Sequence, residues 1–335
     1  MRPATRLVYL LGASTIVASS YAFLHTAHPL PPSSRALVAP TGSSLLLLLR
    51  AAPASNVHVL PAEDDVASAV HHIVENAARE AIMSRGHFAL AIPGGSVLKV
   101  LSTLEPSSDW PTKTTLAFVN HKCVPVDDMG GAIEAQARSK FVDRWGVGKV
   151  VSLGGTGDGD SEAKGYESKL RSLPESVLPR DMDGFPVFDL CLVGVGDDGH
   201  VGSLYPNRDE IDVVDGPWVV ASHKKDPPGI SLTLPVMRGA RRTVISAAGQ
   251  SVKYPNGKAS AMNMAISDGA VTPKSFPAMA LREDAVWILD VPNGSELGLG
   301  TSTVENAVAA VEVAAAAAAA AGGAMEATTA ASEAA

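Results

Sequence analysis

The fold is decided by the stretch Phe88-Ala-Leu-Ala-Ile-Pro-Gly-Gly-Ser-Val-Leu-Lys-Val-Leu101. Its first five residues form a short apolar run, a Pro-Gly-Gly-Ser segment typical of a turn follows, and helical apolar spacing comes next. Strand, glycine turn and helix together predict the start of a βα unit. Two interpretations of this turn stay open. The glycines are needed only for a tight turn with positive φ, or the backbone N–H groups of Gly94, Gly95 and Ser96 also bind an anion such as a sugar phosphate.

Segments on both sides extend this pattern. A helix is predicted at Asp64–Ser84, where apolar residues follow helical spacing behind acidic residues. Further strands are predicted at 115–119, 188–193, 218–222, 243–247 and 285–290, and further helices at 132–145 and 161–173. Apolar strands that alternate with helices favour a largely parallel sheet with helices on both faces. We expect one α/β domain over residues 56–300.

The composition excludes several classes of protein. The chain of 335 residues is 46% hydrophobic and 19% charged, with a net charge of −8, so a nucleic-acid partner is not expected. Its two cysteines, Cys123 and Cys191, are far apart, which argues against a disulfide scaffold and a cysteine-based zinc site. Cys191 lies inside an apolar run and is interpreted as a buried strand residue rather than a catalytic thiol.

The first 55 residues are predicted to be a targeting leader. No Asp or Glu occurs before residue 63, and Arg2 and Arg6 precede the apolar stretch 7–23, as in a signal peptide. Ser20-Tyr21-Ala22 would allow cleavage before Phe23, and the segment after it is rich in Ser, Pro and Ala. This layout resembles the bipartite leaders that direct proteins into complex plastids of algae. The alternatives are a secretory leader alone, a cytoplasmic protein or a membrane anchor, and the apolar stretch is short for a membrane span.

The last segment, residues 301–335, is rich in alanine. It shows no apolar pattern that requires a core, so we expect a low-complexity tail, helical in its alanine run by intrinsic propensity and without an assigned function.

The residues that follow the strand at 188–193 carry the clearest chemistry. The loop runs Gly194-Val-Gly-Asp-Asp-Gly-His-Val-Gly-Ser-Leu-Tyr-Pro206 and places His200 beside two carboxylates. Ligands of open α/β sheets bind beyond the carboxyl ends of the strands, and histidine titrates near neutral pH. His200 therefore fits a general base, although a single histidine in a loop is more often inert.

This loop resembles the signature of 6-phosphogluconolactonases, Gly-x-Gly-x-Asp-Gly-His, two variable residues, then Ser-Leu-Phe-Pro. Supporting segments in the same order are Gly94-Gly95-Ser96, Leu116–Val119 before Val124-Pro125, Ile230–Pro235, Gly257-Lys258-Ala259 and Trp287–Asp290. The resemblance spans roughly residues 57–297. It implies a Rossmann-like fold, a superfamily shared with glucosamine-6-phosphate deaminase, and hydrolysis of 6-phosphogluconolactone in the oxidative pentose phosphate pathway.

Two departures from the family pattern affect the phosphate site. Where the family usually has an acidic residue, Glu and Arg, this chain has Asn120-His121-Lys122, and Gly229 stands where an arginine usually helps to hold the phosphate. Lys122 keeps a positive charge without the bidentate fork of arginine. Lys224 and Lys225 are close enough in sequence to Gly229 to compensate for the missing arginine.

The implied reaction is attack of a water, deprotonated by His200, on the lactone carbonyl. Asp198 either orients the imidazole or caps a following helix. No cofactor and no metal are expected, and the expected partner is a small sugar-phosphate lactone, without stable membrane insertion of the mature domain. The alternatives are a sugar-phosphate isomerase or deaminase, and a sugar-phosphate-binding relative with altered substrate or lost turnover.

Overall fold

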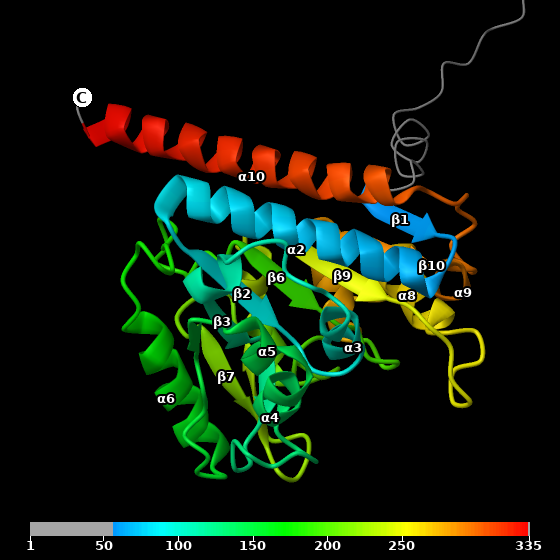
Figure 1. Cartoon of the computed structure of the whole chain (residues 1–335), viewed down its shortest axis with the longest axis horizontal. Helices are drawn as coiled ribbons and strands as arrows, with labels where there is room; N and C mark the ends of the chain where they lie inside the picture. The colour runs from blue at the N-terminus through cyan, green and yellow to red at the C-terminus, as the bar shows by residue number, and fades with distance from the viewer. Residues whose placement is uncertain (1–55, 334–335) are drawn as a thin grey trace, which may run out of the picture. The chain divides into compact units, whose positions relative to one another are not determined.

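A seven-stranded parallel sheet forms the centre of the fold (Figure 1). The computed structural model describes residues 56–333, with side chains to residue 320, and the predicted leader lies outside this range. The strands of this sheet are β1 (Val57–Leu60), β2 (Phe88–Ile92), β3 (Thr114–Phe118), β5 (Lys149–Val150), β6 (Leu190–Val193), β9 (Thr243–Ala247) and β10 (Val286–Asp290). The α-helices are α2 (Glu63–Arg85), α3 (Ser96–Ser102), α4 (Ile133–Ala137), α5 (Asp143–Trp145), α6 (Gly159–Arg171), α7 (Leu234–Arg238), α8 (Ala259–Ile266), α9 (Val291–Gly294) and α10 (Val304–Glu333).

The strand order β1-β10-β9-β6-β2-β3-β5 places a topological switch beside β2. From β2 the chain continues to β3 and β5 on one side, and then crosses to β6 and β9 on the other. The connections that leave β2 and β6 therefore diverge at the carboxyl ends of these neighbouring strands. Such a crevice is where doubly wound sheets bind their ligands.

Both faces of the sheet are buried, which explains the continuous apolar runs in the sequence. Successive side chains of a strand point to opposite faces, and all five residues of β2 are buried. Phe88, Leu90 and Ile92 join one core cluster with α2, α3 and α10, whereas Ala89 and Ala91 join the other with α6 and α8. Cys191 is fully buried in β6, and burial raises the pKa of its thiol to about 12. The predicted largely parallel sheet with helices on both faces is confirmed.

A second, antiparallel sheet was not anticipated. Its strand order is β4 (Asn120–Lys122), β8 (Gly229–Leu232) and β7 (Val219–Ser222). The segment at 218–222 does form a strand, but it belongs to this small sheet and not to the central one. Both β4 and β8 are too short to show the alternation of apolar and polar residues by which a strand is predicted from sequence.

The expectation for the C-terminal segment needs correction. Helix α10 begins at Val304 and lies along α2 (Figure 1). Ala307 and Val311 are fully buried in the core cluster of that face, and Glu312 forms an ion pair with the buried Arg242. Small residues at helical spacing allow two helices to approach closely, so the first turns of this segment belong to the packed domain.

Among the described residues, no helix is both long enough and apolar enough to cross a bilayer.

Candidate functional site

A cavity of about 510 Å³ lies at the carboxyl ends of β2 and β6. The connections that meet here are the glycine turn after β2, the loop after β6, and the segments around β4 and β8. Its polar and charged side chains are Ser96, Asn120, Lys122, Gln136, Asp197, His200, Ser203, Tyr205, Ser222, Lys225, Asp226, Tyr254 and Lys258. The cavity thus lies beyond the carboxyl ends of the strands, where ligands of open α/β sheets bind.

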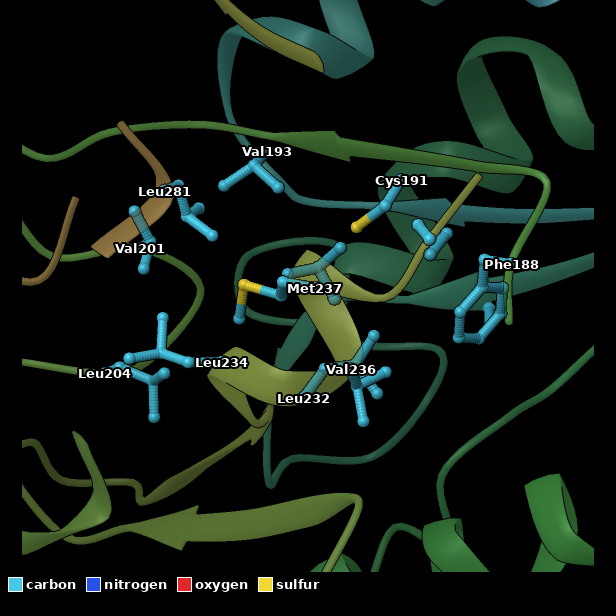
Figure 2. Close-up of a cluster of buried hydrophobic side chains, with 14 of the residues drawn as sticks. Phe188, Cys191, Val193, Val201, Leu204, Leu232, Leu234, Val236, Met237 and Leu281 are labelled. Atoms are coloured by element: carbon cyan, nitrogen blue, oxygen red, sulfur yellow. The ribbon is translucent and has the colours of Figure 1, made fainter. Parts of the chain in front are cut away.

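The loop after β6 is anchored in the core on both sides of its histidine. Cys191 and Val193 lie before it in β6, and Val201 and Leu204 follow it; all four are fully buried (Figure 2). Val201 also forms isolated bridges with Val195 and Leu204. This anchoring fixes the backbone that presents the imidazole of His200 to the cavity.

The imidazole of His200 is held by Asp198. Oδ1 of Asp198 lies 2.5 Å from Nδ1 of His200 and also accepts the backbone N–H of His200 at 3.1 Å. Because an ionised carboxylate can only accept, Nδ1 carries the proton of the neutral ring and Nε2 keeps its lone pair. The His200 side chain lines the cavity and is 27% exposed.

Asp198 bonds to His200 and not to a helix. It accepts no hydrogen bond from a helix, since the residues after it form turns and a short bridge. Burial alone would raise the pKa of Asp198, but the hydrogen bonds from His200 outweigh it and hold this pKa below its ordinary value. Its geometry is that of an orienting partner.

The glycines of the motif have a steric reason. A Cβ atom added at Gly196 would lie 2.0 Å from Nδ1 of His200, so any side chain would displace the ring. Gly199 has φ +82°, and a Cβ there would lie 2.5 Å from the ring of Phe276. Both positions therefore require glycine.

The glycine turn after β2 forms the neighbouring wall. Gly94, Gly95 and Ser96 line the cavity, and Gly95 has φ +74° at the start of α3. A Cβ atom at Gly94 would lie 2.8 Å from Cδ1 of Ile133, the first residue of α4. The turn thus needs glycine both for its backbone and for its contact with α4.

The cations are distributed over three segments. Lys122 on β4 and Lys225 line the cavity. Lys224 does not line it, although both Lys224 and Lys225 are predicted as phosphate-binding candidates from their place in the sequence. Nζ of Lys225 lies 4.9 Å from the ring centroid of Tyr205, and that ring lies 4.7 Å from the imidazole of His200.

A third cation, Lys258, also lines the cavity. It belongs to the Gly257-Lys258-Ala259 segment of the resemblance, but it is not predicted from the sequence as a site residue. It lies at the start of α8, donates to the carbonyl oxygen of Val195, and burial lowers its pKa. Its position after β9, at the same sheet edge as the other loops, is the signal that could have identified it.

The two departures from the family pattern lie at one place. Lys122 and Gly229 are directly paired residues of β4 and β8. A Cβ atom at Gly229 would lie 3.0 Å from the backbone oxygen of His121 and 3.2 Å from Oγ of Ser203. A larger residue at 229 would therefore require His121 or Ser203 to shift by a few tenths of an ångström.

Asp197 and Tyr254 are two further residues that the sequence did not single out. The Tyr254 hydroxyl donates to Oδ2 of Asp197 at 2.8 Å, which joins the segment before α8 to the histidine loop. No group of three or more metal-ligating side chains occurs within residues 56–320.

Comparison with known proteins gives one consistent family. The family model described as glucosamine-6-phosphate isomerases/6-phosphogluconolactonase matches residues 61–288. A probable 6-phosphogluconolactonase of Arabidopsis thaliana is 31% identical over 240 residues, covering 64% of this chain and 84% of the relative. The human 6-phosphogluconolactonase is 28% identical over 256 residues, covering 72% and 93%. A chloroplastic probable 6-phosphogluconolactonase of rice, Oryza sativa subsp. japonica, is 28% identical over 305 residues, covering 85% and 91%.

Solved structures share the fold. The 6-phosphogluconolactonase of Trypanosoma brucei superposes with a TM-score of 0.60 at 20% identity, covering 72% of this chain and 98% of that one. The enzyme of Leishmania guyanensis gives 0.61 at 19% identity, covering 74% and 100%.

Proposed function

Because the chain belongs to the family of glucosamine-6-phosphate isomerases and 6-phosphogluconolactonases, we propose that it hydrolyses 6-phosphogluconolactone to 6-phosphogluconate. The observation that carries this proposal is the Asp198–His200 pair at the edge of the cavity, which in the neutral ring places the proton on Nδ1 and the lone pair on Nε2. An imidazole in this state is suited to deprotonate a water beside a lactone carbonyl.

The reaction proceeds in two steps. Nε2 of His200 takes a proton from water as the water oxygen bonds to the carbonyl carbon, and the carbonyl electrons move onto oxygen. When this tetrahedral intermediate collapses, the bond to the ring oxygen breaks, and the imidazolium returns the proton to the leaving alkoxide. Asp198 stabilises the transient positive charge on the imidazole, since its carboxylate lies 2.5 Å from Nδ1.

The phosphate is assigned to the cations and the glycine turn. Lys122, Lys225 and Lys258 line one cavity with Gly94, Gly95 and Ser96. Within residues 56–320, no carboxylate lies within ion-pair distance of these three lysines. Of the three lysines, Lys122 stands where the family usually has an arginine, and each of them acts as a point charge.

Removal of these lysines should lower kcat/KM only for the phosphorylated substrate. For Lys122→Ala, Lys225→Ala and Lys258→Ala we expect a weaker phosphate interaction by roughly 1.5–3 kcal/mol each, about one to two decades in kcat/KM. Hydrolysis of the unphosphorylated gluconolactone should change little. The matched control is Lys224→Ala, adjacent in sequence but outside the cavity lining. Equal losses on both substrates would argue against a phosphate role.

We further propose that the leader directs the chain to a plastid. The leader residues lie outside the described range, so the proposal rests on their sequence and on relatives named as chloroplastic in rice and Arabidopsis thaliana.

A fusion of residues 1–60 to a fluorescent protein, expressed in an alga with a complex plastid, should give plastid fluorescence. Retention in the secretory route would reduce the leader to a signal peptide, and a cytosolic signal would refute the targeting proposal. Replacing Arg2 and Arg6 by Glu provides the control, because it removes the positive region before the apolar stretch.

A further inference from the structure

His121 occupies a special position on β4. Its neighbours Asn120 and Lys122 face the cavity, while the imidazole of His121 points to the opposite side and is fully buried. Its ring packs at 5.3 Å against the ring of Phe118 on β3. The residue therefore lies behind the cavity wall and does not line the cavity.

The hydrogen bonds of His121 allow one protonation state only. Nδ1 lies 2.7 Å from the carbonyl oxygen of Lys122, and Nε2 lies 2.9 Å from the backbone nitrogen of Glu134. A carbonyl oxygen only accepts and a backbone N–H only donates, so Nδ1 carries the proton and Nε2 accepts. A protonated ring would bring its own N–H against that of Glu134 and lose this bond.

The bond to Glu134 supports the start of α4. Glu134 lies in the first turn of that helix, whose N-cap residue Ala132 has no side chain able to cap it. The same turn carries Ile133 and Gln136, which line the cavity, and Ile133 packs on Gly94. Nε2 of His121 thus ties the first turn of α4 to β4, and Ile133 in the same turn contacts the glycine turn.

The charged groups around His121 do not favour its neutral form. The carboxylate of Glu134 on α4, itself bonded to Arg138 and Ser152, and that of Glu162 on α6 both raise the pKa of His121. The phenol of Tyr166 on α6 is bonded to the backbone of Phe118 and not to the imidazole. Burial is the larger effect, and the pKa of His121 lies below its ordinary value of 6.5.

We propose that His121 is a positioning residue whose neutral imidazole holds the first turn of α4 against the glycine turn, and that its protonation releases this wall of the cavity. The free energy that stabilises the wall is then fully present above about pH 6.5, the value for an exposed histidine, and is lost as the pH falls below it. Uptake of one proton on opening raises the opening equilibrium by at most about tenfold per pH unit.

The test is hydrogen exchange of the backbone amides of residues 130–137 in the free protein between pH 5 and 8, corrected for the intrinsic pH dependence of exchange. The parent should lose protection in this segment as the pH falls below about 6.5, approaching tenfold per unit. His121→Gln keeps one donor and one acceptor without a titrating group, and should remove this pH dependence. His121→Phe removes the acceptor and should lower protection about tenfold or more at every pH.

His87→Gln is the matched control, because His87 lies at the amino end of β2 and bonds Thr115, away from the cavity. It should retain the pH dependence of the parent. The same pH dependence in His121→Gln as in the parent, or an Nε2-protonated ring of His121 in a nitrogen-15 spectrum at pH 7, would overturn the proposal. If His121→Phe fails to fold, the parent and His121→Gln still decide the outcome. No lactone is used, so the result is independent of whether the cavity catalyses hydrolysis.

Discussion

Replacement of His200 by glutamine is expected to lower kcat/KM for 6-phosphogluconolactone by about 10²–10⁴, the usual contribution of a positioned general base. Affinity for the product 6-phosphogluconate should stay within a few-fold, because our proposal assigns the phosphate to the cavity's lysines and glycine turn and not to the imidazole. The rate is measured above the spontaneous hydrolysis of the lactone, and product affinity by calorimetry.

The control for this variant is His72→Gln, an exposed histidine on α2. It should hydrolyse the lactone at the parent rate. A His200→Gln protein that folds, binds product and retains the parent rate would rule out His200 as the base.

Gly196→Ala should have an effect nearly as large as loss of the base itself. The added Cβ atom would lie 2.0 Å from Nδ1 and 2.8 Å from Oδ1 of Asp198, so the His200 ring must leave its position. A displacement of about 1 Å in a catalytic group typically costs on the order of 10²-fold. We expect kcat to fall by two decades or more, while circular dichroism stays unchanged.

Gly165→Ala is the matched control, since it makes the same chemical change inside α6 with no atom within 4 Å of the new Cβ. It should preserve activity and slightly stabilise the helix. Full activity in Gly196→Ala would mean that the observed contact between the imidazole and Asp198 is dispensable.

Much of the central sheet could be predicted because its strands are buried on both faces. β2 and β9 are uninterrupted apolar or small-residue runs, and α2 shows helical spacing over its whole length. The histidine loop could be predicted because it directly follows a strand and its contiguous residues match a family signature, and its glycines prove to be local steric requirements.

The residues that were missed depend on contacts between distant segments. β4 and β8 pair across more than 100 positions, and nothing local in Asn120-His121-Lys122 indicates a strand. The alanine-rich segment was underestimated because alanine was counted as low complexity, although Ala307, Val311 and Ala315 follow helical spacing. Lys258 reaches the site only through the strand order, which brings the end of β9 beside β6.

The most direct test of the central claim is proton release on hydrolysis of 6-phosphogluconolactone by the protein, followed at constant pH. Opening the lactone yields a carboxylic acid, so each turnover releases one proton at neutral pH. We predict a rate well above spontaneous hydrolysis, saturable in substrate and at least tenfold more efficient than with unphosphorylated gluconolactone. A protein that binds 6-phosphogluconate yet leaves the spontaneous rate unchanged would contradict the account and identify a sugar-phosphate-binding relative without turnover.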